Sequence, residues 1–252
     1  MTEVAEALPG VRRLEHVMGG PVYVDVRDES DGRAIERLFD WLRWVDATFS
    51  TYREDSEISR IAAGTLPLAE AHPEVQAVLE RCESLRGETD GYFDVYATGR
   101  LDPSGYVKGY SVDRGAELLE ADGIRSYAIN AAGDIRAAGC PHPEPEWRIG
   151  IEHPLEHDKL AAVAALNDGA VATSAAYARG DHVLDPHTRS APAGVLSVTI
   201  TGPELGTADA YATAAFAMGE AGPAWTARLR DYEALTILAD QRVLSTPGFP
   251  RG

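Results

Sequence analysis

Hydrophobic residues recur along this chain in two patterns, one with a period of two residues and one with a period near 3.6. The first pattern predicts strands, and the second predicts helices that bury one face. Residues 11–27 alternate with the shorter period and are broken by Met18-Gly19-Gly20-Pro21. This segment therefore predicts a hairpin, or a tight connection at a sheet edge.

The longer period predicts four main helices and two short ones. The main helices are expected at residues 31–49, 73–86, 106–120 and 207–218, and the short ones after Asp55 and at residues 225–230. Asp55 is a candidate N-cap, while Pro73 and Gly87 are typical of a helix start and a helix end. Further strands are expected at residues 126–130, 134–138, 147–151, 160–166, 170–173, 195–201 and 234–238.

The order of these elements indicates the fold class. Strands are grouped in the middle of the chain with helices before and after them, which favours an α+β fold over alternating βαβ units. The sequence contains no internal repeat and no clear linker. We therefore expect one compact domain over residues 1–252, with about the first 10 and the last 8 residues at its periphery.

Composition and charge narrow the possible partners. The chain is 44% hydrophobic and 25% charged, as is typical of a soluble globular protein. Its net charge of −17 argues against nucleic acid as a partner. The sequence has no apolar run of ~18 residues and its acidic start is unlike a secretory signal, so we expect a cytoplasmic protein without membrane insertion. The two cysteines, Cys82 and Cys140, suit reduced thiols.

Residues 101–114, LDPSGYVKGYSVDR, have the features of an anion site. Asp102 favours a turn, Gly105 lets a bound group approach the backbone, and Lys108 adds positive charge to the first helical turn. The helix start also presents free N–H groups. An ordinary loop-to-helix junction is the alternative.

Asp209 and Thr213 lie four residues apart in the helix predicted at residues 207–218. They therefore share one helix face, where a carboxylate and a hydroxyl can hold a hard cation such as Mg²⁺. The alternative is an aspartate stabilised by the helix dipole beside a threonine that is simply packed.

A third unusual stretch, residues 172–188, places His182 between two aspartates. Such a histidine can be held in one tautomer and tuned towards neutral pH, although a structural loop histidine is the alternative. Asp134 either caps a turn or reaches a ligand. The Rossmann, P-loop, zincin and hydrolase-elbow signatures are absent from the sequence.

Taken in order, these segments resemble the motifs of the ApbE family, the FAD:protein FMN transferases. The matching segments are TYREDSEISR, TDGYFDV, LDPSGYVKGYSVDR, INAAGDIRAAG, ATSAAYARGDHVLDPHT and ADAYATAAFAMG, between about Met18 and Gly219. The third and the last of them are similar to the family patterns D-[LP]-[SG]-G-x-x-K-G-x-x-x-D and A-D-A-x-A-T-A. The shared order of the motifs makes the resemblance stronger than any one of them.

The resemblance implies an α+β, T-fold-like domain with two lobes around a central cleft for flavin and metal. It implies that Asp209, Thr213 and the Gly105 carbonyl bind Mg²⁺, or Mn²⁺ in its place, and that His182 activates the acceptor hydroxyl. Asp209 thereby counts as catalytic together with His182. FAD is the implied substrate, and the residues at FAD positions are Met18, Tyr52, Tyr92, Phe93, Asp94, Asp102, Lys108 and Val183.

The implied reaction transfers FMN from FAD to a Thr or Ser of an acceptor protein and releases AMP. The alternatives are an FAD pyrophosphatase that forms FMN and AMP, and a non-catalytic FAD-binding protein. Three departures from the family pattern bear on this choice: the short connection from Asp94 to Leu101, alanines at 132 and 175 in place of glycines, and Gly20 in place of threonine.

Overall fold

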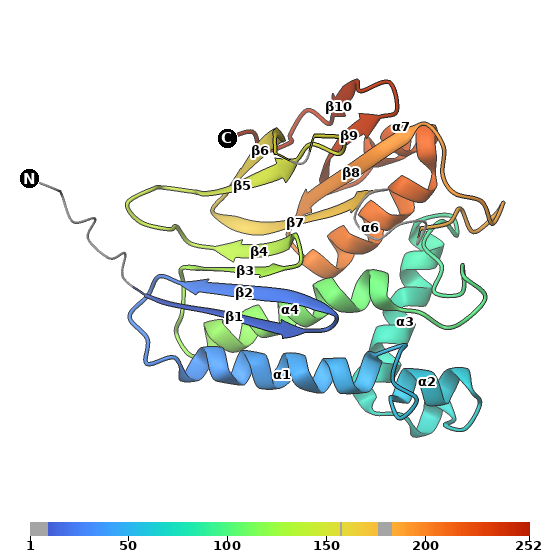
Figure 1. The fold of residues 1–252 in the computed structure, drawn as a ribbon, viewed down its shortest axis with the longest axis horizontal. Coiled ribbons are helices and arrows are strands. Elements are labelled where there is room, and N and C mark those ends of the chain that lie inside the picture. The colour runs from blue at the N-terminus through green and yellow to red at the C-terminus, as the bar shows by residue number, and fades with distance from the viewer. Residues whose placement is uncertain (1–9, 157, 176–182) are drawn as a thin grey trace, which may run out of the picture.

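The computed structural model describes residues 10–156, 158–175 and 183–252, and its largest element is an eight-stranded antiparallel sheet. Its strands are β1 (Val11–Val17), β2 (Gly20–Val26), β3 (Tyr127–Ala131), β4 (Asp134–Ala138), β7 (Asp168–Ala175), β8 (Val195–Gly202), β9 (Glu233–Leu238) and β10 (Val243–Ser245). They follow one another across the sheet in that order (Figure 1). A small separate sheet pairs β5 (Trp147–Glu152) with β6 (Leu160–Leu166).

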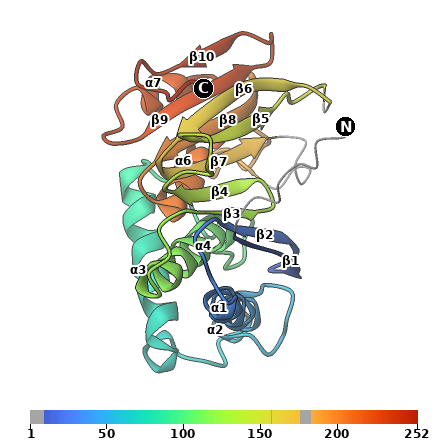
Figure 2. The ribbon, with the colours of Figure 1, turned by 90° about the vertical axis from the view of Figure 1, so that its left-hand side faces the viewer.

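Helices cover one face of the large sheet and the small sheet covers part of the other. The helices are α1 (Arg33–Phe49), α2 (Glu57–Ala62), α3 (Pro73–Glu88), α4 (Ser104–Ala121), α6 (Leu205–Ala217) and α7 (Gly222–Thr226). Figure 2 shows α3, α4 and α6 on one side of the sheet. On the other side, Trp147 and Ile149 of the small sheet pack over Val171 and Leu235. This arrangement confirms the predicted α+β class in a single compact domain.

Two apolar clusters divide the helical side into two lobes. One cluster lies between the sheet and α1, α4 and α6, and it includes Val24, Leu38 and Ile129. The other is built mainly by the end of α1, by α2 and α3, and by the first turn of α4, and it includes Ile58 and Val75. Because α1, α4 and α6 supply residues to both clusters, these three helices connect the two lobes.

The first hairpin is tighter than its sequence predicts. Its turn consists of Met18 and Gly19 alone, with φ values of 55° and 77°, and Gly20 already pairs with Val17. A two-residue turn with both φ values positive matches the twist of the flanking strands. The non-glycine Met18 therefore occupies a left-handed conformation that L-residues adopt at a cost of about 1 kcal/mol.

Several helix boundaries also differ from the predictions. Ser56, not Asp55, caps α2, because its Oγ accepts a hydrogen bond from Ser59 N at 3.0 Å. Helix α3 continues past Gly87, and α4 begins two residues earlier than expected. Strand β10 was not predicted, because its residues are all exposed and carry no burial pattern. Within the described ranges no helix is long and apolar enough to cross a membrane.

Helices α4 and α6 meet backbone to backbone. A Cβ atom added at Gly109 would lie 2.5 Å from the Leu205 carbonyl oxygen and 2.7 Å from the Gly206 Cα. A Cβ added at Gly206 would lie 3.0 Å from the Tyr110 nitrogen. Real Cβ atoms do not approach backbone atoms this closely, so these two glycines set the separation of the helices.

The Gly109→Ala variant tests this contact. We expect its free energy of unfolding to fall by roughly 1–3 kcal/mol, because the added methyl forces the two backbones apart. Gly87→Ala makes the same change in α3, where a Cβ would meet nothing within 4 Å, and it should be neutral or stabilising by up to about 1 kcal/mol. Urea denaturation measures both. Equal effects of the two substitutions would contradict the assigned contact.

Candidate functional site

The predicted anion site lies where α4 begins. The Oδ1 atom of Asp102 accepts a hydrogen bond from Ser104 N at 3.1 Å, which forms the turn into the helix. Gly105 therefore sits in the first helical turn, and a Cβ added there would lie 3.4 Å from Phe93 Cε2 and 3.5 Å from Thr213 Oγ1. The start of α4 thus lies against Thr213 of α6, as the sequence-based hypothesis requires.

Asp209 and Thr213 occupy successive turns of α6, as expected. Asp209 is 4% exposed, whereas Thr213 is half-buried. The Thr213 hydroxyl lies 3.4 Å from the Ser174 hydroxyl, which belongs to β7. Ser174 thus adds a hydroxyl that the sequence analysis did not assign, although its ATS segment carries part of the family resemblance.

Lys108 joins the two buried carboxylates of the site. Its ammonium group forms an ion pair with Asp134 Oδ2 and lies 3.6 Å from Asp209 Oδ2. Asp134 is 2% exposed, and its Oδ1 accepts a hydrogen bond from Thr173 N at 3.0 Å. Asp134 thus lies beside the predicted site, with its carboxylate facing Lys108, and a contact from it to a ligand stays a prediction. Lys108 is one of only two lysines in the chain.

The oxygen atoms at this place suit a hard divalent cation. A buried carboxylate and a hydroxyl are ligands that Mg²⁺ accepts, and the ion keeps other positions for water and phosphate. The Gly105 carbonyl is an acceptor for the Gly109 N–H in a regular α-helix, but a carbonyl oxygen has a second lone pair. Among the described residues no three His, Cys, Asp or Glu side chains form a metal cluster. The expected set of ligands contains only one such side chain.

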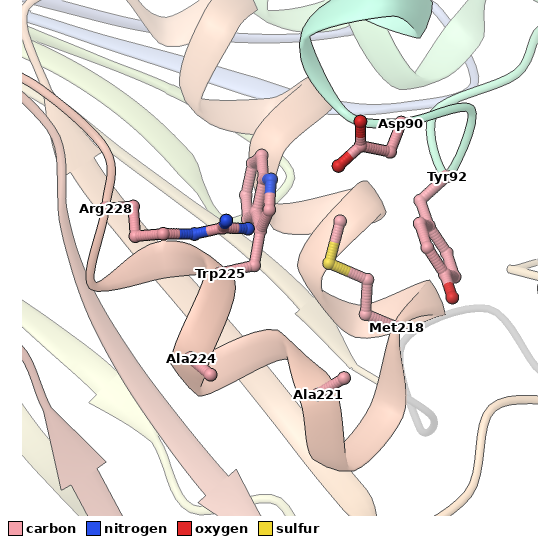
Figure 3. A pocket seen from close by; sticks show the side chains of 7 residues that line it. All are labelled: Asp90, Tyr92, Met218, Ala221, Ala224, Trp225 and Arg228. Atoms are coloured by element: carbon pink, nitrogen blue, oxygen red, sulfur yellow. The ribbon is translucent and has the colours of Figure 1, made fainter.

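The turn predicted to bind flavin consists of Tyr92, Phe93 and Asp94, and these three residues have different surroundings. Phe93 is buried against Gly105, while the Asp94 carboxylate accepts a hydrogen bond from Tyr96 N at 2.8 Å. Tyr92 instead lines a cavity of about 500 Å³. That cavity is bounded by Asp90, Tyr92, Met218, Ala221, Ala224, Trp225 and Arg228 (Figure 3).

The cavity lies away from the Asp209 side of α6. Its Trp225 packs edge-on against Tyr211 at 5.4 Å between ring centroids. Tyr211 follows Asp209 by two residues, or about 200° around the helix axis. Tyr92 therefore contributes to this cavity, whereas Phe93 lies against Gly105 of the predicted metal site.

The loop that follows His182 packs against the turn that contains Asp90 and Tyr92. The Nε2 atom of His187 lies 3.2 Å from the Asp90 carbonyl oxygen, and its ring packs edge-on against Tyr92 at 4.6 Å. Partial burial raises the pKa of Asp185, but hydrogen bonds from His187 N and Thr188 Oγ1 outweigh it and lower that pKa below its usual value. The ionised Asp185 thus orders the loop.

The remaining predicted residues are less closely grouped. The Met18 sulfur accepts a hydrogen bond from Ser111 of α4 at 3.3 Å, and Val183 packs on the core between sheet and helices. Tyr52 is 86% exposed in the loop between α1 and α2. His182, the predicted base, lies outside the described residues.

Two departures from the family pattern are neighbours in space. A Cβ added at Gly20 would lie 3.1 Å from the Ala132 Cβ. Ala132 adopts a φ of 51° in the turn between β3 and β4, a conformation that favours glycine. The methyl group at 132 therefore fills space that a larger side chain at 20 would need.

Known proteins share this sequence pattern. A model of the ApbE family matches residues 18–99 and 96–236. The chain is 28% identical to an FAD:protein FMN transferase of Vibrio cholerae over 259 residues, covering 79% of this chain and 77% of that relative. It is 32% identical to an FAD:protein FMN transferase of Rhodobacter capsulatus, but the match covers 59% of this chain and only 30% of that relative.

Solved structures share the fold. A crystal structure of an ApbE protein from Thermotoga maritima matches with a TM-score of 0.86 and 22% identity, covering 96% of this chain and all of that one. The flavin transferase ApbE from Vibrio cholerae matches with a TM-score of 0.85 and 23% identity, covering 95% of this chain and 98% of that one. The fold expected from the sequence motifs is therefore confirmed.

The Lys108→Met variant tests the buried charge cluster. It keeps the apolar stem and removes the charge between Asp134 and Asp209, so we expect the free energy of unfolding to fall by roughly 1–3 kcal/mol. Lys159→Met removes the other lysine, which forms an exposed ion pair with Glu156, and should change it by less than about 0.5 kcal/mol. Chemical denaturation at pH 7 compares them. A Lys108 variant as stable as the Lys159 variant would show that the cluster contributes nothing.

Proposed function

This chain belongs to the ApbE family, and we propose on that premise that it is a metal-dependent FAD:protein FMN transferase. Its substrates are FAD and a Thr or Ser hydroxyl of an acceptor protein, and its products are the flavinylated acceptor and AMP. The observation that carries the proposal is the convergence of Gly105 and Lys108 on α4 with Asp209 and Thr213 on α6. The names of the Vibrio and Rhodobacter relatives support the same reaction.

The proposed reaction is a transfer between two oxygens at one phosphorus atom. The acceptor oxygen attacks the flavin-side phosphorus of FAD and a new P–O bond forms. The bond from that phosphorus to the bridging oxygen breaks, and AMP leaves. Such chemistry depends on charge neutralisation and in-line placement more than on a covalent nucleophile of the enzyme.

The chain's own residues divide this task. The N–H groups at the start of α4 favour a phosphate, and one turn further on the Lys108 ammonium offsets part of the negative charge of Asp134 and Asp209. Asp209, Thr213 and the Gly105 carbonyl would hold Mg²⁺ or Mn²⁺, since oxygen ligands serve both ions. When bound, the ion supplies neutralisation of the pyrophosphate charge. A neutral His182 imidazole takes the proton of the acceptor hydroxyl. The cytoplasmic location remains a prediction from the sequence.

The Asp209→Asn variant tests the metal assignment. Replacing one carboxylate oxygen by an amide nitrogen weakens a Mg²⁺ site, so we expect AMP release from FAD to fall at least ~100-fold at low Mg²⁺. Excess Mn²⁺ should restore part of the rate. Asp240→Asn, at an exposed ion pair with Arg242, serves as the control and should keep the wild-type rate. The assignment fails if the Asp209 variant releases AMP at the wild-type rate with the same dependence on Mg²⁺ concentration.

The His182→Ala variant tests the assigned base. We expect transfer of FMN to the acceptor to slow ~10²- to 10⁴-fold, because the hydroxyl loses its general base, while FAD binding persists. An FMN mass increment on the acceptor and the AMP released are measured together, with His142→Ala as the control. In the same assay, an FMN label on the acceptor made by the wild-type protein supports the transferase. If the wild-type protein releases AMP without labelling the acceptor, it is an FAD pyrophosphatase. If it holds intact FAD and releases no AMP, it is a non-catalytic binding protein.

A further inference from the structure

We propose that Asp113 is a positioning residue that fixes the start of α6 against α4. It thereby holds Asp209 and Thr213 opposite Gly105 and Lys108. For its activity readout the inference rests on the function proposed above, whereas its structural readouts stand without it.

Asp113 caps a helix to which it does not belong. Its two carboxylate oxygens accept hydrogen bonds from Leu205 N at 3.0 Å and from Gly206 N at 2.8 Å. The first N–H groups of an α-helix have no partner within the helix, and Glu204, at the N-cap of α6, makes no capping bond with its side chain. A residue of α4 therefore satisfies the start of α6, where negative charge is also favoured by the helix dipole.

The cap adjoins the place where the two backbones touch. Gly109 lies one turn before Asp113 on α4 and contacts the same residues, Leu205 and Gly206. The contact sets how closely the helices approach. The paired hydrogen bonds add direction, because a carboxylate that accepts from two adjacent N–H groups fixes both the rotation and the axial position of the helix end.

Both helices carry site residues within about two turns of this cap. Lys108 precedes Asp113 by five residues on α4, and Asp209 follows Gly206 by three residues on α6. An α-helix rises about 1.5 Å per residue, so the cap and the site are joined by short, stiff segments. A displacement of α6 at its first turn is therefore transmitted to Asp209 and Thr213, where errors near 1 Å are costly to phosphoryl transfer.

A second contact extends the arrangement to the strand that carries Asp134. Arg136 of β4 donates a hydrogen bond to the Gly169 carbonyl oxygen at 3.0 Å, and its Nε lies 3.9 Å from Asp113 Oδ1. Burial raises the pKa of Asp113 to about 6, against the backbone hydrogen bonds and the Arg136 charge, which lower it. Arg136 thus faces Asp113 while its strand presents Asp134 to Lys108.

Three variants separate positioning from simple stabilisation. Asp113→Ala removes both acceptors, Asp113→Asn keeps one of them at nearly unchanged shape, and Glu117→Gln alters an exposed carboxylate one turn later on α4. For each variant we would measure amide exchange at Leu205 and Gly206, Mn²⁺ affinity without FAD, and kcat and KM for AMP release. Amide exchange measures the strength of the cap, Mn²⁺ affinity measures the geometry of the site, and kcat and KM measure the reaction.

We expect Asp113→Ala to exchange the two amides at least ~10-fold faster, to bind Mn²⁺ at least ~10-fold more weakly, and to lose at least ~10-fold in kcat with little change in KM for FAD. Asp113→Asn should lie between this variant and wild type, and Glu117→Gln should match wild type.

The inference is overturned if Asp113→Ala exchanges these amides faster yet keeps the Mn²⁺ affinity and kcat of wild type, since Asp113 would then only stabilise the helix. If that variant does not fold, Asp113→Asn and Asp113→Ser, which retain an acceptor, decide the question by the same readouts. A wild-type protein that binds Mn²⁺ but releases no AMP refutes the proposed function alone. If wild type binds no Mn²⁺, the metal assignment falls, and amide exchange together with kcat for AMP release then decides the inference about Asp113.

Discussion

The backbone contact between α4 and α6 is the constraint on which the site depends. Gly109 and Gly206 let two helices approach more closely than any side chain would permit. The helix α6 is rich in alanine and almost wholly buried between α4 and the sheet. Because small residues line the contact on both α4 and α6, the two helices pack closely and form one rigid support. That support carries a lysine from one helix and an aspartate and a threonine from the other.

The charges at the site differ from the net charge of the whole chain. The chain carries a net charge of −17, yet the site places a lysine ammonium between two almost fully buried aspartates. Exposed charges more than roughly 8 Å away are screened at physiological salt, so the acidic surface does not determine the potential felt by a bound phosphate. Under the proposed function, the groups near a bound phosphate are the helix N–H groups and the Lys108–aspartate cluster, and these matter more than the net charge of the protein.

Much of the fold could be predicted from periodicity, because strands and helices that bury one face mark themselves in sequence. The 134–138 and 160–166 strands were predicted with their observed bounds. The proximity of Gly105 and Thr213 was also expected, but only from the family resemblance, since no local pattern joins residues so far apart. The partner of Asp113 lies 92 residues away, and its role as a cap for another helix leaves no local signal. The sequence likewise showed no sign of the exposed strand β10 or of the different surroundings of Tyr92 and Phe93.

The proximity of Gly20 and Ala132 has a consequence for how such sequences vary. The turn of the first hairpin and the turn between β3 and β4 share room for a limited volume of side chain. A threonine beside a glycine and a glycine beside an alanine are two ways of dividing that volume. A larger side chain at position 20 is therefore accommodated more easily when position 132 carries a glycine than when it carries an alanine.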